Sequence, residues 1–198
     1  MGSSGRQHDA LVCAAALGAT ALTAAVAGRH PRGDRRLFAA VNGRGGELAG
    51  LRVLQQAGTP WALPATALAA ALAGRRRLAL AAALALPVEK SLEVGIKKAR
   101  PLPRPLYVEP TVLRDDAPVE GESFPSGHAA IAFAAAVLAL PDVPHRVGAL
   151  LLAVAAGSAL VRVSQGAHHL ADAVGGAALG TAVGSGLNAC VGRTGHRT

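Results

Sequence analysis

Long apolar stretches alternate with short, mostly basic segments along the 198-residue chain. We expect each apolar stretch to be a helix, because a backbone exposed to lipid must satisfy its own hydrogen bonds. The expected helices are Ala10–Gly28, Gly58–Gly74, Leu78–Ile96, Ser126–Leu140, Val147–Val161 and Ala173–Cys190. The pattern therefore predicts an all-α, polytopic membrane protein built as a six-transmembrane-helix bundle.

The first apolar segment, Ala10–Gly28, has 19 residues without a charge, enough to span a bilayer core as a helix. It exceeds the usual apolar core of a secretory signal and further apolar segments follow it, so we expect a retained membrane anchor. We expect residues 10–190 to form a single domain. Residues 1–9 are expected to be an N-terminal tail or an expression-tag remnant, and residues 191–198 a C-terminal tail.

Three further features of the pattern bear on packing. Leu37, Phe38 and Val41 predict a short amphipathic helix in the membrane interface. The 15 residues from Ser126 to Leu140 reach only about 22 Å as a helix, against about 30 Å of hydrocarbon. The polar groups at the ends of such a short helix are therefore expected in a recess below the lipid headgroups. Glycines at four-residue spacing in the last segment favour close helix contact, although glycine is common throughout the chain. They are Gly176, Gly180 and Gly184.

The composition supports a membrane location. Hydrophobic residues make up 51% of the chain, and the formal net charge is +8, with 17 Arg against 3 Lys. A basic balance of this kind also occurs in nucleic-acid-binding proteins. Here the arginines lie between apolar stretches, which fits anionic lipid headgroups better. We therefore expect the lipid bilayer, and no nucleic acid, as a partner.

Charged residues beside apolar segments are candidates for function, because burying charge in a membrane is costly. Lys97 and Arg104 flank a proline-stiffened stretch, and both side chains are suited to phosphate oxygens. Taken alone, this cluster fits a solvated, basic helix end at the lipid headgroups better than it fits a binding site.

The turn Pro-Ser-Gly-His at residues 125–128 opens the fourth apolar segment. Ser126 can cap the helix, and Gly127 lets an anion approach the free backbone amides of the helix start. His128 stands beside these amides as a potential proton donor. By itself the turn could equally be an ordinary helix cap.

A third cluster joins the fifth apolar segment to the sixth. Arg162 ends one segment, while His168 and Asp172 have the four-residue spacing that places two side chains on one helix face. A carboxylate bonded to one imidazole nitrogen fixes the tautomer and makes the other nitrogen a better nucleophile. A solvated polar loop and a metal pair are the alternatives, but no further residue has recognisable metal-ligand spacing.

Together the three clusters resemble the signature of the type 2 phosphatidic acid phosphatase (PAP2) superfamily, which also includes vanadium haloperoxidases. That signature is Lys, six residues, Arg-Pro; then Pro-Ser-Gly-His; then Ser-Arg, five residues, His, three residues, Asp. The matching residues are Lys97, Arg104-Pro105, residues 125–128, Arg162, His168 and Asp172, within a core of about residues 90–185. Val161 departs from the pattern where the family commonly has serine, which removes one potential hydrogen bond to phosphate.

The resemblance implies a bundle with a PAP2-type phosphatase core and a metal-independent lipid phosphatase that needs no cofactor. His168 would attack phosphorus and become a phosphohistidine, Asp172 would orient it, and His128 would protonate the leaving group. The implied phosphate-binding residues are Lys97, Arg104, Ser126, Gly127 and Arg162. The implied substrate is a membrane lipid with a phosphate monoester or diphosphate, of the polyprenyl (di)phosphate, phosphatidic acid or phosphatidylglycerol phosphate type.

Other readings stay open. A lipid phosphotransferase would use the same phosphohistidine with a second alcohol in place of water, a haloperoxidase-like enzyme would use a similar anion pocket, and a non-enzymatic lipid-binding membrane protein is the third alternative. Glu93 lies four residues before Lys97 and could orient it, or it could form an ion pair with Lys90, with Glu89 nearby.

The location follows from composition and resemblance together. Abundant Arg and Ala suggest a GC-rich bacterial gene, hence a bacterial inner or plasma membrane. The resemblance favours an active site on the extracytoplasmic side, whereas the distribution of Arg and Lys between the two sides leans weakly the other way. The sequence assigns neither a particular lipid nor an oligomeric state.

Overall fold

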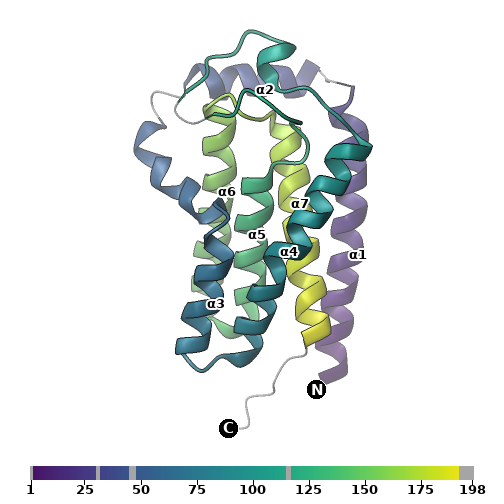
Figure 1. Cartoon of the computed structure of the whole chain (residues 1–198), viewed down its shortest axis with the longest axis vertical. Coiled ribbons are helices and arrows are strands. Elements are labelled where there is room, and N and C mark those ends of the chain that lie inside the picture. The colour runs from purple at the N-terminus through teal and green to yellow at the C-terminus, as the bar shows by residue number, and fades with distance from the viewer. Residues whose placement is uncertain (1, 30–31, 45–47, 115–116, 192–198) are drawn as a thin grey trace.

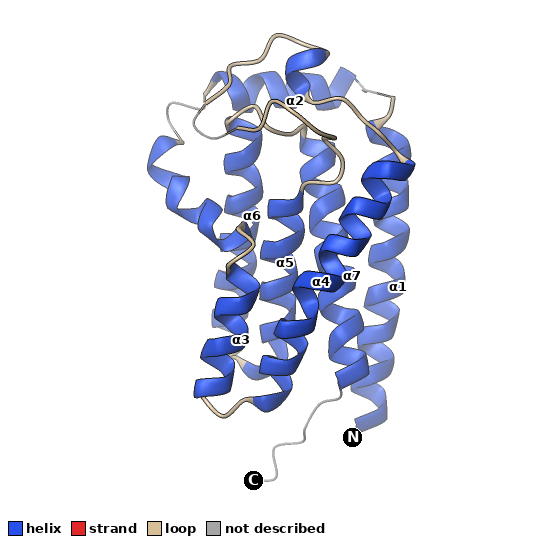
Figure 2. Ribbon diagram, in the orientation of Figure 1, coloured by secondary structure: helices blue, strands red, loops and turns tan. Residues whose placement is uncertain are grey.

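The structure is a computed structural model that describes residues 2–29, 32–44, 48–114 and 117–191. Within these residues it consists of α-helices, 3-10 segments and loops, without a strand (Figure 2). The elements are α1 (Gly2–Ala27), α2 (Arg32–Gly43), η1 (Ala49–Gly58), α3 (Ala62–Leu72), α4 (Arg76–Ala99), η2 (Pro105–Tyr107), α5 (Gly127–Ala139), η3 (Leu140–Asp142), α6 (His145–Ser164) and α7 (Leu170–Val191).

The predicted all-α architecture is confirmed, and each of the six apolar segments contains a helix: α1, α3, α4, α5, α6 and α7. α1 begins at Gly2, so residues 2–9, which were expected to form a tail, extend the first helix instead. Of the expected C-terminal tail, Val191 is the last residue of α7 and residues 192–198 lie outside the described residues.

The prediction of six membrane-spanning helices is wrong. In the described residues, three helices are long and apolar enough to cross a membrane, namely Ser4–Ala27, His145–Ser164 and Leu170–Val191. α3 has 11 residues and α5 has 13, so they reach only about 17 and 20 Å, against about 30 Å of hydrocarbon. α4 has 24 residues but carries Glu89, Lys90 and Glu93 in its second half. Apolar composition alone therefore predicts too many spans, because helix length and the charges of α4 also decide whether a helix can cross a membrane.

The short amphipathic helix predicted around Leu37, Phe38 and Val41 is present as α2. It lies across one end of the bundle (Figure 1). Phe38 is fully buried beneath it, while Leu37 faces outward. α2 therefore covers the end of the bundle at which α4 ends and α5 and α7 begin (Figure 1).

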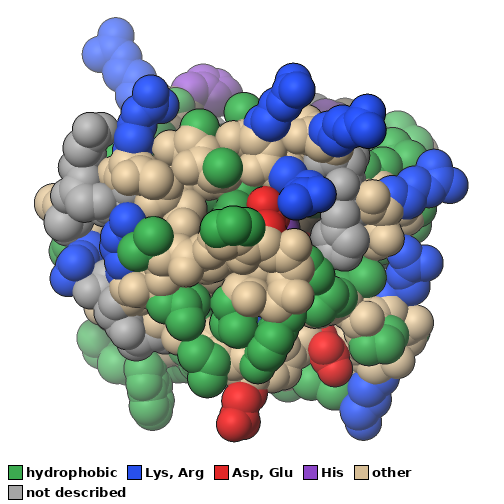
Figure 3. Space-filling model, turned by 90° about the horizontal axis from the view of Figure 1, so that it is seen from above, with side chains coloured by type: hydrophobic (Ala, Val, Ile, Leu, Met, Phe, Trp, Pro, Cys, Tyr) green, Lys and Arg blue, Asp and Glu red, His purple; other side chains and the backbone are tan. Residues whose placement is uncertain are grey.

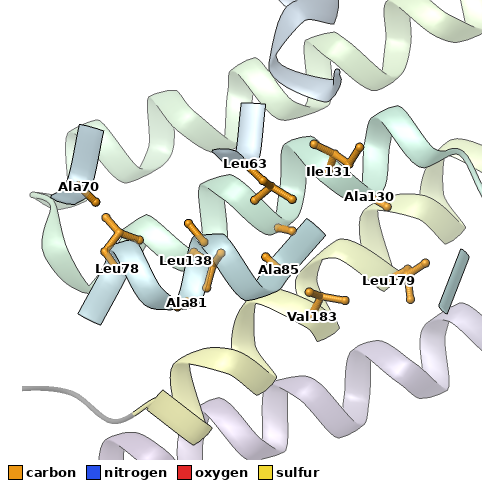
Figure 4. Close-up of a cluster of buried hydrophobic side chains, with 12 residues drawn as sticks. Leu63, Ala70, Leu78, Ala81, Ala85, Ala130, Ile131, Leu138, Leu179 and Val183 are labelled. Atoms are coloured by element: carbon orange, nitrogen blue, oxygen red, sulfur yellow. The ribbon is translucent and has the colours of Figure 1, made fainter. Parts of the chain in front are cut away.

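Small side chains dominate the bundle interior. The largest apolar cluster joins α3, α4, α5 and α7 and contains six buried alanines beside six larger residues (Figure 4). Its buried members are Leu63, Ala70, Leu78, Ala81, Ala82, Ala85, Ala130, Ile131, Ala134, Leu138, Leu179 and Val183. Alanines let helix axes approach closely, so the polar ends of these helices are brought together.

The glycine row of the last helix confirms the predicted close contact between helices. A Cβ atom on Gly176 would collide with the carbonyl oxygen of Ser126, and one on Gly180 with that of Ala130. Gly184 lies against Val137 further along the same helix. α7 therefore packs directly on the backbone of α5, and this seam fixes the distance between the start of α5 and the start of α7.

Candidate active site

A cavity of about 150 Å³ lies at the end of the bundle that α2 covers. Residues from all three predicted motifs line it, although they come from separate parts of the chain. The lining residues are Gly58, Pro60, Lys90, Glu93, Lys97, Arg104, Pro118, Gly127, His128, Ile131, Arg162 and His168. Viewed from this end, the molecule shows Lys and Arg side chains spread around its edge (Figure 3).

Two arginines lie close together in this cavity. Arg104 is 5% exposed; its Nε donates to the carbonyl oxygen of Glu120 at 2.8 Å and its Nη1 to that of Ala167 at 3.0 Å. Arg162 is equally buried, and its Nη1 donates to Oε1 of Gln165 at 2.8 Å. Burial, and after it the charge of Arg162, lowers the pKa of Arg104. Two buried guanidinium groups that repel each other are stabilised by an anion between them.

His168 lies in the loop before α7 and is 4% exposed. Its Nδ1 is 3.8 Å from Oδ2 of Asp172, which is an electrostatic contact longer than a hydrogen bond. Burial lowers the pKa of His168; Asp172 opposes this effect, while Arg104 and Arg162 add to it. The imidazole is therefore held neutral near pH 7, which is the form that can act as a nucleophile.

Asp172 lies behind His168, outside the lining of the cavity. Its Oδ2 accepts a hydrogen bond from the hydroxyl of Ser123 at 2.6 Å and another from the backbone N–H of His169 at 2.8 Å. The carboxylate is 2% exposed and fixed by these two donors. Ser123 was not predicted from the sequence, because no spacing rule relates a loop serine to a residue 49 positions away.

The start of α5 contributes in two different ways. Gly127 and His128 line the cavity, whereas Ser126, predicted to contact phosphate, does not. The hydroxyl of Ser126 instead accepts from the N–H of Ala129 at 3.5 Å, as a weak helix cap, and its own backbone N–H donates to the carbonyl oxygen of Asp172. Ser126 therefore ties the start of α5 to the start of α7.

Glu93 makes both contacts that were expected from the sequence, one with Lys97 and one with Lys90. Its Oε1 accepts a hydrogen bond from Nζ of Lys97 at 2.6 Å, and its Oε2 is paired with Nζ of Lys90. Glu89 is fully buried one turn earlier, with its Oε2 3.6 Å from the same Lys90 nitrogen. Lys90 also lines the cavity, which the sequence motifs did not indicate.

A second polar group surrounds His169, the neighbour of His168 in the chain. Its Nε2 lies 2.6 Å from Oε1 of Glu109, and its ring packs against Phe38 of α2 at a centroid distance of 5.2 Å. Burial opposes protonation of His169, but Asp172 and Glu109 outweigh it and raise its pKa. The N–H of Ala171 donates to Asp34 of α2 at 3.1 Å. These contacts hold α2 against the loop that carries His168.

A larger cavity of about 710 Å³ lies near the beginning of α1 and the end of α5, away from the motifs. Its lining includes the buried Asp9 and, among the residues that the structure describes, no Lys or Arg, so it does not suit an anion. Across the described ranges, no group of three or more His, Cys, Asp or Glu side chains is placed to hold a metal ion. The small cationic cavity is therefore the candidate active site.

The fold and the site define a helical membrane protein with a cation-lined cavity at one end of its bundle. The family model of the PAP2 superfamily matches residues 76–195, and the chain belongs to this superfamily of phosphoesterases. The resemblance seen in the three motifs is thus confirmed. No curated protein and no solved structure matches the chain.

Proposed function

We propose that this protein hydrolyses a phosphate monoester or diphosphate on a membrane lipid through a phosphohistidine at His168. The convergence of three sequence motifs on one cavity carries the proposal: Lys97, Arg104, Arg162, His128 and His168 all line the same 150 Å³. Superfamily membership supports phosphatase chemistry in general, and the three long apolar helices support a lipid substrate.

The first step forms the covalent intermediate. Nε2 of His168 attacks phosphorus while the bond from phosphorus to the leaving oxygen breaks, and His128 gives that oxygen its proton. Asp172 stabilises the positive charge that develops on the His168 ring. The guanidinium groups of Arg104 and Arg162 meet the charge of the non-bridging oxygens, which is the main requirement of phosphoryl transfer.

The second step releases phosphate. A water molecule attacks the phosphorus of phosphohistidine, the bond from phosphorus to Nε2 of His168 breaks, and His128 takes up the proton that the water loses. Both histidines return to their starting state, so the cycle consumes only the lipid phosphate and water. The residues proposed to act need no metal ion and no cofactor.

The test is phosphate release by the full chain in detergent, measured with a panel of polyprenyl phosphate, polyprenyl diphosphate, phosphatidic acid and phosphatidylglycerol phosphate. We expect His168→Ala to abolish release and Lys97→Ala to reduce it strongly. Two matched controls should retain activity: His145→Ala, at the far end of the bundle, and Lys98→Ala, the exposed neighbour of Lys97. Equal release by wild type and His168→Ala would disprove the proposal.

The same assay addresses the alternative of transfer. Adding a second alcohol should leave total phosphate release unchanged if water is the acceptor, whereas a phosphotransferase would form a new phosphate ester at the expense of free phosphate. A lipid-binding protein without catalytic activity would release no phosphate from any member of the panel.

We further propose a bacterial inner-membrane location with the cavity on the extracytoplasmic side. A single cysteine at the exposed Val119, in a chain whose Cys13 and Cys190 are replaced by serine, reports the side of this loop. Labelling of intact cells by a membrane-impermeant maleimide is expected. Labelling only after lysis would place the cavity on the cytoplasmic side.

A further inference from the structure

The cation-lined cavity contains an acid. Among the described residues that line the cavity, Glu93 is the single acidic one, and it is 6% exposed. Both lysines of the cavity are turned towards its carboxylate: Nζ of Lys97 donates to Oε1 at 2.6 Å, and Nζ of Lys90 pairs with Oε2. A carboxylate in this position would repel a phosphate, so its place in a phosphate site requires an explanation.

The carboxylate of Glu93 also lies against the start of α5. A Cβ atom on Gly127 would come within 2.6 Å of its Oε1 and within 2.9 Å of its Cδ and Oε2. The carboxylate therefore fills the space that the glycine leaves at the first residue of the helix. The N-terminus of a helix attracts anions through its free amides and its dipole. Two ammonium groups and a helix start are the surroundings that a bound phosphate would require.

We infer that Glu93 occupies the anion position of the unliganded protein and that the phosphate of the substrate must displace its carboxylate. The inference rests on the proposed function and makes Glu93 a determinant of specificity. On displacement, Lys97 exchanges its carboxylate partner for a phosphate oxygen. Lys90 keeps a second acid, since Glu89 lies 3.6 Å from its Nζ on the buried side of α4.

This exchange sets a charge threshold for binding. The lipids that surround a membrane protein are largely phosphodiesters with one charge on phosphorus, and replacing one singly charged group by another gains little electrostatic energy. A terminal phosphate carries up to two charges and gains more from Arg104, Arg162 and Lys97. Glu93 thus favours terminal phosphates over the phosphodiesters of the bilayer.

Binding of inorganic phosphate to the full chain in detergent, measured by calorimetry, tests the inference without relying on catalysis. We expect Glu93→Gln to bind phosphate about tenfold more tightly than wild type, because a negative charge that repels the phosphate from within a few ångströms is removed. Glu93→Ala should act in the same direction, and it guards against an effect peculiar to the amide. Glu89→Gln is the matched control: it makes the same acid-to-amide substitution one turn away on α4, outside the cavity lining, and should change binding by less than about twofold.

Arg104→Ala distinguishes a failure of the inference on Glu93 from a failure of the proposed phosphate site. If it abolishes phosphate binding while both Glu93 variants bind as wild type or more weakly, Glu93 only positions Lys97; the inference is then overturned and the proposed function stands. If Arg104→Ala binds phosphate as tightly as wild type, the cavity is not a phosphate site and both fall.

Discussion

Nδ1 of His168 lies 3.8 Å from Oδ2 of Asp172, while the same oxygen accepts shorter hydrogen bonds from Ser123 and from the N–H of His169. The carboxylate of Asp172 is therefore oriented by neighbours other than the imidazole of His168. Catalytic hydrogen bonds are often long in unliganded enzymes and tighten when substrate is bound. We expect the contact between His168 and Asp172 to shorten when His168 gains positive charge during phosphoryl transfer.

Removing the hydroxyl of Ser123 should slow catalysis without weakening substrate binding. A hydrogen bond to a charged group contributes about 1.5–3 kcal/mol, so Ser123→Ala is expected to lower kcat by about tenfold or more. KM should change little, because Ser123 lies outside the cavity lining. Ser91→Ala, which removes an exposed hydroxyl bonded only to its own helix, should keep wild-type kcat. A change confined to KM would contradict a positioning role for Ser123.

The acid side of the pH–rate profile should lie below the usual pKa of histidine, about 6.5. The proposed attack on phosphorus requires a neutral His168, and the pKa of His168 is lowered by burial and by Arg104 and Arg162. Activity is thus retained as the pH falls through 6.5 and is lost only as it passes through the lower pKa. The measurement is kcat/KM of the wild type as a function of pH.

A charge-removing variant checks the cause of that shift. Arg104→Met removes a positive neighbour, which favours the protonated imidazole of His168, so the acid limb of its residual activity should move to higher pH. Arg104→Lys retains the charge and should leave the limb near its wild-type position. An acid limb at or above pH 6.5 in the wild type would refute a neutral, buried nucleophile.

The glycine seam between α5 and α7 should be sensitive to a single methyl group. Gly180→Ala would place a Cβ against the carbonyl of Ala130, and overpacking of this kind costs about 1–3 kcal/mol. Its melting temperature in detergent should fall. Gly95→Ala, on an open face of α4 with nothing within 4 Å, should leave stability unchanged or raise it by up to about 1 kcal/mol. Equal melting temperatures for the two variants would show that the seam is not close-packed.

Adjacent residues of α2 provide another matched pair. Phe38 is fully buried against His169, so Phe38→Ala should lower the free energy of unfolding by about 3 kcal/mol through the cavity that it leaves. Leu37 is 52% exposed, and Leu37→Ala should change that free energy by less than about 0.5 kcal/mol. Chemical unfolding in detergent measures both. If Phe38→Ala is as stable as Leu37→Ala, α2 is not anchored to the site by this ring.

Most residues of the candidate site could be predicted from the sequence, because the spacing of residues along a helix or turn determines which side chains lie close together. The spacing from Arg162 through His168 to Asp172 predicted that these side chains lie close together. In the structure Arg162 and His168 line one cavity, and Asp172 lies behind His168. Contacts made by residues far apart in the chain could not be predicted in this way. Ser123 and Glu109 reach the site from loops, and no local pattern marks either residue.

The fold was predicted in kind but not in detail. Apolar composition identified the helices, since alanine and leucine favour helix and burial together. It did not distinguish a helix that crosses a membrane from one that is merely buried among its neighbours. α5 is almost entirely apolar, yet with 13 residues it is a buried central helix rather than a span.

The contact of Gly176 and Gly180 with α5 has a consequence for how the cavity can open. α7 is in direct contact with the backbone of α5 there. We therefore expect α5, which carries His128, and α7, which follows His168, to move as one unit. The cations Lys90 and Lys97 belong to α4, which meets this unit mainly through alanine side chains. A change in the width of the cavity would then require movement of α4 with Lys90 and Lys97, while His128 and His168 keep their positions relative to each other.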